Sequence, residues 1–185
     1  MRRIFTVIAL ACTTFAYAQR PQQTNANTGT EEVLRRVADK VIQSTTFKFV
    51  NAQTGEKFDS TKGIPSGTIV RAESAYNKWN YPNGVLTIGL MQMADALKDK
   101  KYSDYAERNI SMIFDNQSFF ETLYNNTPAA NRNVAVPRTE YGAMFAMGSL
   151  DNTGAMSAGI TDVNALIKRK DIESYLDRSA DYIST

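Results

Sequence analysis

Histidine is absent from the 185 residues, and cysteine occurs once, at Cys12. Without histidine the chain has no side chain whose ordinary pKa lies near neutrality, and no imidazole ligand for zinc. Cys12 lies in a segment that we expect to be removed, so the mature chain also has no disulfide, thiolate ligand or cysteine nucleophile. Any catalysis must therefore use carboxylates, tyrosines, lysines or hydroxyl groups.

A hydrophobic run of membrane-spanning length is also missing at the N-terminus, where the apolar run at residues 4–11 is too short to cross a bilayer. This run follows the basic Arg2 and Arg3 and precedes the A-x-A cleavage signal at residues 16–18, a pattern typical of a secretory signal peptide. We expect residues 1–18 to be removed on export to the bacterial periplasm. Lipid attachment at Cys12 is less favoured, because Leu10 stands one place off the usual lipoprotein pattern.

Neither sign of charge is in excess in the mature chain. Removal of residues 1–18, which hold two arginines and no acidic residue, lowers the formal charge from +2 to 0. Such a chain has no basic surface for nucleic acid or for an anionic membrane, so we expect neither partner, and we expect no metal or cofactor. Its composition, 43% hydrophobic and 22% charged, is typical of one soluble globular domain.

The residues that are present show mainly helical periodicity. Residues 19–30 are polar and aperiodic and predict a flexible N-terminus, and residues 44–73 predict an extended or looped excursion. The domain proper would span residues 31–185 and open with a helix over 31–43. One buried face of that helix would carry the apolar pairs Val33/Leu34, Val37/Ala38 and Val41/Ile42.

Two helical hairpins follow, and the second repeats the first at a distance of 70 residues. The shift places Gly84 on Gly154 and Tyr105 on Tyr175 without a gap, which favours a repeated αα unit, although two unrelated amphipathic hairpins would also give this pattern.

Residues 116–149 hold polar turns and a helix at 141–147. The prediction is an all-α fold, an incomplete ring of about three helical hairpins. The apolar stripes are Leu86, Leu90, Met93, Leu97, Ala106, Ile110 and Ile113, then Met156, Ile160, Val163 and Ile167.

A polar segment precedes each hairpin, at residues 77–84 and 149–154, and we call these the pre-hairpin segments. In a ring of hairpins they lie at the same end and gather their side chains around one mouth. Aromatic rings suit the apolar faces of sugars, while amides and carboxylates suit the hydroxyls. The alternative is that Trp79 and Tyr81 close the end of the core. The candidate site residues are Trp79, Tyr81, Asn83, Asp151 and Asn152.

Asp151 has two interpretations. An aspartate just before a helix accepts hydrogen bonds from the free N–H groups of the first turn, which stabilises the helix by about 1 kcal/mol. The same carboxyl could instead transfer a proton. Asn152 could cap the helix equally well, which would leave Asp151 available for chemistry.

The stretch WNYPNGVLTIGLMQMADALKDKKYSDYAERNI at residues 79–110 resembles the W-x-Y-x-x-G-V opening and following helix of the unsaturated glucuronyl and rhamnogalacturonyl hydrolases, glycoside hydrolase families 88 and 105. LDNTGAMSAG at residues 150–159 resembles the next landmark of these families, L-D-[DN]-x-G, and the resemblance covers residues 31–185. It implies an (α/α)6 toroid that acts on oligosaccharides released by polysaccharide lyases. These enzymes hydrate the C4=C5 double bond of the unsaturated uronyl residue, after which the next sugar is expelled.

Carried over by position, Asp151 corresponds to the aspartate that assists the acid/base residue, and Tyr81, with Trp79 beside it, to the aromatic residues of the opening. The principal acid/base aspartate of the family belongs to a later W-x-D segment, and no tryptophan follows Trp79. The sequence is therefore expected to be the N-terminal part of such an enzyme, inactive in isolation. The alternatives are a non-enzymatic helical-repeat module that binds a glycan or a protein, and, with less support, an epimerase or mannanase. The particular oligosaccharide and the oligomeric state stay open.

Overall fold

A computed structural model describes residues 24–128 and 141–185, with side chains from residue 29 onward. The predicted signal peptide and residues 19–23 lie outside this described part. The chain divides at Arg35 into two compact units, of which the second, Arg36–Thr185, holds the elements that concern the site. Seven α-helices and one small sheet occupy the described part, which confirms the mainly helical prediction. None of these helices is long and apolar enough to cross a membrane.

The first helix, α1 (Thr24–Ser44), begins seven residues before the predicted start at residue 31. In its second half Ala38 and Val41 are buried in a cluster with Leu90 of the first hairpin. Val37 is 59% exposed, so the predicted buried face does not extend to Val37. Periodicity shows which residues share a face of a helix, but not how much of that face finds a partner.

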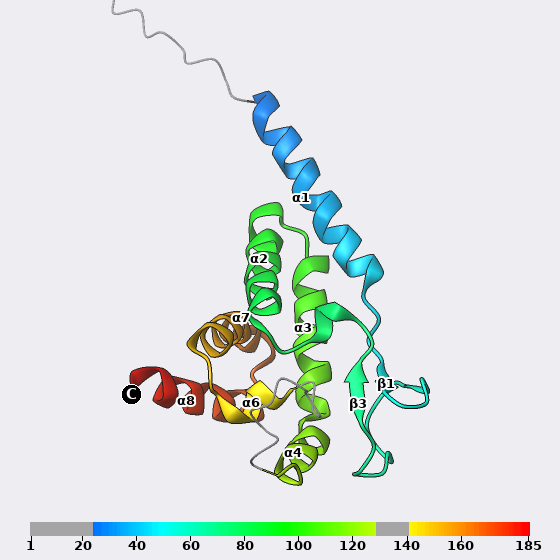
Figure 1. The fold of residues 1–185 in the computed structure, drawn as a ribbon. Coiled ribbons are helices and arrows are strands. Elements are labelled where there is room, and N and C mark those ends of the chain that lie inside the picture. Colours follow the sequence, from blue (N-terminus) through cyan, green and yellow to red (C-terminus); the bar gives the residue numbers. More distant parts are fainter. Residues whose placement is uncertain (1–23, 129–140) are drawn as a thin grey trace, which may run out of the picture. The chain divides into compact units, whose positions relative to one another are not determined.

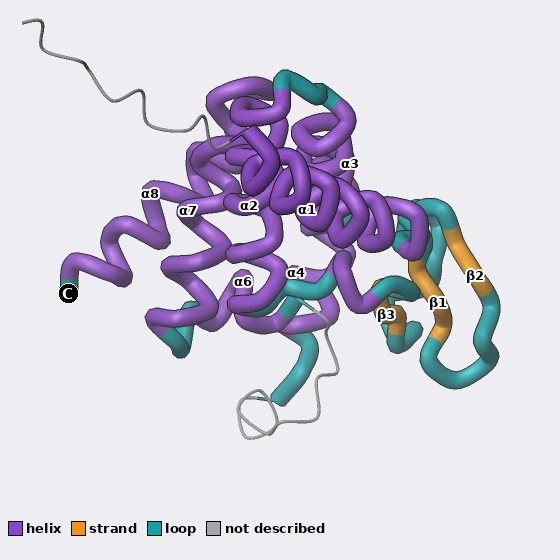
Figure 2. Tube along the Cα trace, turned by 90° about the horizontal axis from the view of Figure 1, so that it is seen from above, coloured by secondary structure: helices purple, strands orange, loops and turns teal. Residues whose placement is uncertain are grey.

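The predicted extended excursion forms a three-stranded antiparallel sheet of order β2-β1-β3 (Figure 2). Its strands are β1 (Phe49–Asn51), β2 (Lys57–Phe58) and β3 (Val70–Ala72), and the short 3-10 helix η1 (Ala75–Asn77) follows. Phe49 on the central strand lies opposite Phe58 and Ala72 and is fully buried against the helical core. The sheet thus covers one part of the helices and leads directly into the first pre-hairpin segment.

Both predicted hairpins are present (Figure 1). The first pairs α2 (Tyr81–Leu97) with α3 (Lys101–Asp115), and the second pairs α7 (Leu150–Ile167) with α8 (Lys170–Ser184). Lys98 and Lys168, 70 residues apart, end α2 and α7 in the same way, each in the left-handed conformation with φ of 50° and 52°. The 70-residue correspondence seen in the sequence therefore extends to the ends of the helices.

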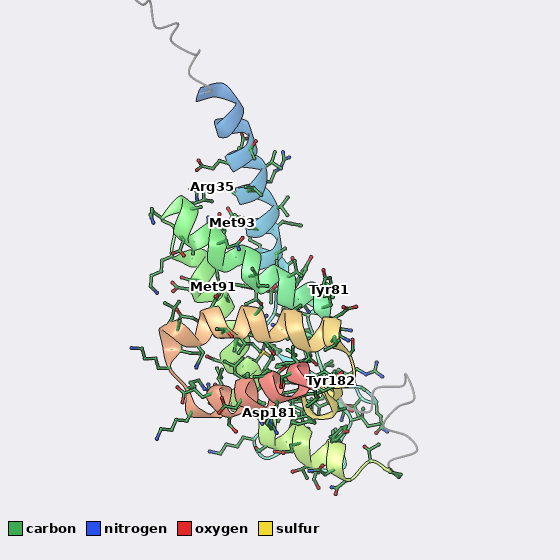
Figure 3. All side chains as sticks on the ribbon, turned by 90° about the vertical axis from the view of Figure 1, so that its left-hand side faces the viewer. Arg35, Tyr81, Met91, Met93, Asp181 and Tyr182 are labelled. Carbon is green, nitrogen blue, oxygen red and sulfur yellow. The ribbon has the colours of Figure 1, made fainter. Side chains whose placement is uncertain are left out.

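The two hairpins meet where α2 packs on α7. A Cβ atom at Gly84 would lie 2.5 Å from the carbonyl carbon of Ala155, and one at Gly159 would lie 3.0 Å from the carbonyl oxygen of Gly84. These glycines are needed because the two backbones approach so closely that a side chain would not fit. Figure 3 shows α2 and α7 side by side and running in the same direction, with Tyr81 at the end where both begin.

Two short helices lie between the hairpins, α4 (Gln117–Asn125) and α6 (Gly142–Ala146). α6 confirms the helix predicted at residues 141–147, whereas α4 occupies the first part of residues 116–149, where polar turns were expected before that helix. Phe120 of α4 and Tyr141 before α6 are fully buried, and their rings meet edge to face with centroids 4.6 Å apart. The main core gathers buried apolar residues from the sheet, from the loop before α2 and from the third and later helices: Phe49, Val70, Trp79, Ile110, Phe114, Phe120, Tyr141, Met144, Met156, Ile160, Val163, Ile172 and Tyr175.

Candidate functional site

The two pre-hairpin segments lie against each other, as expected of a ring of hairpins. The backbone N–H of Tyr81 donates a hydrogen bond to Oδ1 of Asn152, with 2.8 Å between the two atoms. This contact joins the first turn of α2 to the first turn of α7 across 71 residues of sequence. The structure therefore brings Tyr81, Asp151 and Asn152 to one end of the α2–α7 pair.

Trp79 lies in the core rather than in the mouth. Its side chain is only 5% exposed, and its ring meets the rings of Tyr175 and Phe114 edge to face with centroids 5.1 and 6.3 Å apart. The sequence left open whether Trp79 contacts a sugar or closes the core, and the second interpretation describes this structure. A sugar cannot stack on a ring that is already enclosed by two others.

Asn83 also has a structural task. It is 6% exposed, and its Nδ2 donates to the carbonyl oxygens of Ala75 at 2.9 Å and Lys78 at 2.8 Å. Because both amide hydrogens are used in this way, Asn83 fastens the loop that precedes α2 and presents no donor to a ligand. The structure therefore gives Asn83 a structural role, and substrate binding by Asn83 stays a prediction.

A buried amide pair that the sequence analysis missed holds the same loop. Asn77 is fully buried, and its Nδ2 donates to Oδ1 of Asn109 at 2.7 Å. Asn109 in turn donates to the carbonyl oxygen of Tyr76 at 3.0 Å, and the hydroxyl of Tyr141 donates to the carbonyl oxygen of Asn77 at 3.0 Å. The asparagine-rich composition of residues 77–83 was the only signal in the sequence, and it does not name the partners.

Asp151 lies on the surface in the first turn of α7 and is not its cap. The cap is Ser149, whose Oγ accepts a hydrogen bond from the backbone N–H of Asn152 at 3.4 Å. Neither of the two predicted capping residues therefore serves as the cap. Within residues 24–128 and 141–185 the carboxylate of Asp151 has no hydrogen-bond partner. A negative charge in the first helical turn still complements the helix dipole.

Exposed apolar side chains accompany Asp151 at this end of the helices. Tyr81 is 50% exposed, Val85 45% and Leu150 61%. Single exposed apolar residues are common on protein surfaces, but Tyr81 and Leu150 each occupy the first position of their helix. At this end of the helices the structure thus exposes the aromatic ring of Tyr81 and the side chain of Asp151.

A groove of about 570 Å³ lies at the other end of the same helix pair. Met91, Ala94, Ala165 and Leu166 make it partly apolar, and the remaining lining side chains are mostly charged or polar. The sequence gives no signal for this groove, because charged residues at these positions have the pattern of a solvated helix face. Its other lining residues are Gln92, Asp95, Lys98, Lys100, Ser103 and Asp162.

Ion pairs fasten the turn of each hairpin to a neighbouring helix. Lys101 pairs with Asp39 of α1 at 2.9 Å, and Arg169 pairs with Asp115 at the end of α3 at 2.6 Å. Arg169 also contacts Asp171 at 2.6 Å, and this bond, followed by the bond to Asp115, raises the pKa of the guanidinium. The same Arg169 contact lowers the pKa of Asp171. These charges hold the hairpins in place and lie away from Asp151.

Within the described residues no three potential metal ligands among aspartate, glutamate, cysteine and histidine come together. The site thus consists of the Tyr81 ring, the free Asp151 carboxylate and the Asn152 amide at the joined ends of two parallel helices. Comparison of the chain with family models, with curated proteins and with solved structures finds no match.

Proposed function

We propose that this chain forms the N-terminal part of an (α/α)6 toroid of the unsaturated glucuronyl or rhamnogalacturonyl hydrolase type, and that its mouth is one wall of an oligosaccharide site. The proposal rests on the family landmarks in the sequence and on the hydrogen bond from Tyr81 to Asn152. A toroid of this kind needs parallel inner helices whose first turns converge, and α2 and α7 meet that requirement. The substrate would be an unsaturated uronyl oligosaccharide released by a polysaccharide lyase, encountered after export to the periplasm.

The residues at the mouth divide into two groups in this proposal. Asp151 supplies a carboxylate to the reacting ring, and the exposed ring of Tyr81 supplies an apolar surface for a sugar face. Trp79 and Asn83, which the sequence also nominated, act only by holding the mouth in shape. The sugar platform is therefore Tyr81 rather than Trp79.

The reaction itself is a hydration, so it needs an acid and a base but no metal. A proton is delivered to C4, the oxygen of a water molecule bonds to C5, and the second proton of that water passes to a base. The hemiketal that results opens to a C5 ketone as its hydroxyl proton passes to the ring oxygen. The C1–O bond to the next sugar then breaks, and the oxygen of that sugar takes up the proton of the C1 hydroxyl as C1 becomes an aldehyde. In the family the principal acid/base aspartate belongs to a W-x-D segment that these 185 residues do not contain, so Asp151 assists a carboxyl supplied by another segment.

The experiment uses the protein purified from its native cells and unsaturated disaccharides made by lyase digestion of pectin or of glycosaminoglycans. Hydration removes the conjugated double bond, so the loss of its ultraviolet absorbance reports the rate directly. Asp151→Asn should lower kcat on the order of 100-fold, the typical contribution of a group that takes part in proton transfer. Asp162→Asn in the groove is the matched control and should leave the rate unchanged. Absence of turnover with every disaccharide, or an unimpaired Asp151→Asn, contradicts the proposal.

The groove favours a second candidate, a helical-repeat module that binds a protein partner. The exposed side of α8 carries the charged residues Glu173, Asp177 and Asp181 together with the apolar Ile183. The exposed Leu166, 52% accessible, lies in the groove and would be an anchor for a partner helix. Leu166→Asp and Asp151→Asn separate the two functions, because the first should abolish only partner binding and the second only sugar turnover.

A further inference from the structure

The first turn of α2 has one backbone donor that its own cap does not serve. Asn80 caps this helix, with its Oδ1 accepting from the N–H of Asn83 at 3.1 Å, and Pro82 has no N–H to satisfy. The N–H of Tyr81 is thus the remaining donor of the turn, and its acceptor comes from the other hairpin, Oδ1 of Asn152 at 2.8 Å. Asn152 therefore caps a neighbouring helix rather than its own.

Asn152 is itself held firmly enough to act as such a cap. Its own N–H is bonded to Oγ of Ser149 at 3.4 Å, so the turn that carries it is closed. Asn152, Ala155 and Gly159 follow one another at the spacing of a single helix face. Ala155 and Gly159 are the positions where the backbones of α2 and α7 nearly touch. The hydrogen bond and the close backbone contact therefore fix the same face of α7 against α2.

From this geometry we infer that Asn152 is a positioning residue: its side chain fixes the place of the Asp151 carboxylate relative to the ring of Tyr81. This inference rests on the proposed function of Asp151. Adjacent residues of a helix point about 100° apart, so when Asn152 faces α2 the side chain of Asp151 is turned toward the exposed surface beside it. An error of about 1 Å in the position of a reacting group can lower the rate on the order of 100-fold. A hydrogen bond that fixes the first turn of α7 would therefore affect the rate.

The inference differs from the sequence expectation, in which Asn152 binds the substrate. The positioning role uses the acceptor Oδ1, whereas a substrate contact would have to rely on the donor Nδ2, because Oδ1 already has a partner. Asn152→Asp separates the two roles, since aspartate keeps the acceptor and loses the donor. Asn152→Ala removes both.

Two measurements on the same variants test the inference. The first is hydrogen exchange at the Tyr81 amide, which needs no catalytic activity. Loss of a capping bond corresponds to about 1 kcal/mol, so Asn152→Ala should speed this exchange roughly fivefold, and Asn152→Asp should leave it near the wild-type rate. Asn80→Ala is the control, because it should affect the Asn83 amide and not that of Tyr81. An unchanged Tyr81 amide in Asn152→Ala overturns the inference whatever the activity.

The second measurement is the rate of disaccharide hydration by the protein from native cells. Asn152→Ala should lower kcat about tenfold or more with little change in KM, and Asn152→Asp should restore most of kcat. A rise in KM in both variants would assign Asn152 to substrate binding, and an unchanged kcat in Asn152→Ala would also overturn the positioning role. If the wild-type protein shows no turnover, the proposed function fails. The exchange rate of the Tyr81 amide would still show whether Asn152 holds the first turns of α2 and α7 together.

Discussion

The indole of Trp79 meets the ring of Tyr175 edge to face, with ring centroids 5.1 Å apart. Trp79 precedes the first hairpin and Tyr175 belongs to the second helix of the second hairpin, so this contact joins the two repeats. Phe114 of α3 completes the cluster, with its centroid 6.0 Å from that of Tyr175. The only tryptophan of the chain is therefore part of the seam between the hairpins.

Replacement of Trp79 should lower the stability of the fold, because its side chain packs in the core. Trp79→Ala should lower the free energy of unfolding by about 3–5 kcal/mol, because it empties a site enclosed by two aromatic rings. Trp79→Phe keeps part of that packing and should cost less. Urea denaturation followed by circular dichroism measures both. If Trp79→Ala unfolds at the wild-type urea concentration, the indole is not a core residue.

Gly84 and Gly89 lie in the same helix and should respond to alanine in opposite ways. At Gly84 the new Cβ would collide with the backbone of Ala155, so Gly84→Ala should lower the free energy of unfolding by about 1–3 kcal/mol. At Gly89 no atom lies within 4 Å of the new Cβ, and alanine favours the helix, so Gly89→Ala should raise stability by about 0.5–1 kcal/mol. Thermal unfolding of both variants checks the prediction, and equal effects would show that α2 and α7 do not approach closely.

The buried amide pair should show coupling between its two members. Asn109→Ala leaves the side chain of Asn77 fully buried without its acceptor, which should cost about 1–3 kcal/mol of unfolding free energy. In the double variant with Asn77→Ala, the cost should be less than the sum of the two single costs, because no amide is then left without a partner. A double-mutant cycle by urea denaturation measures this coupling, and strictly additive costs would contradict the pairing.

The ion pair of Arg169 and Asp171 should make stability depend on acid pH. The pKa of Asp171 in the folded chain is lowered from its ordinary value of 3.8, mainly by its hydrogen bond with Arg169. The folded state therefore binds the proton less readily than the unfolded state, and the stabilisation is present above the ordinary pKa and lost as the pH falls through the lower, folded pKa. Unfolding free energies measured between about pH 5 and pH 2 should fall less steeply in Asp171→Asn than in the wild type.

The sequence by itself determined the helices of the two hairpins and the way they are repeated. Hydrophobic spacing is a local property of a chain, and the stripes of α2, α3 and α7 lie in the structure where that spacing predicted. The N-cap of α7 was expected at Asp151 or Asn152 and lies instead at Ser149, directly before the first helical position. The 70-residue shift predicted that the pre-hairpin segments would meet, and they do so at Tyr81 and Asn152.

Only the tertiary structure decided which of the nominated residues face solvent. Composition cannot distinguish a tryptophan that stacks on a sugar from one enclosed by Tyr175 and Phe114, because the enclosing rings come from distant parts of the chain. The same holds for Asn83, whose amide bonds to the carbonyl groups of its own loop, and for Asn152, whose partner lies 71 residues away. Periodicity assigns a side chain to a face of its helix, but the packing of α2 on α7 determines whether that face forms core, contact or site.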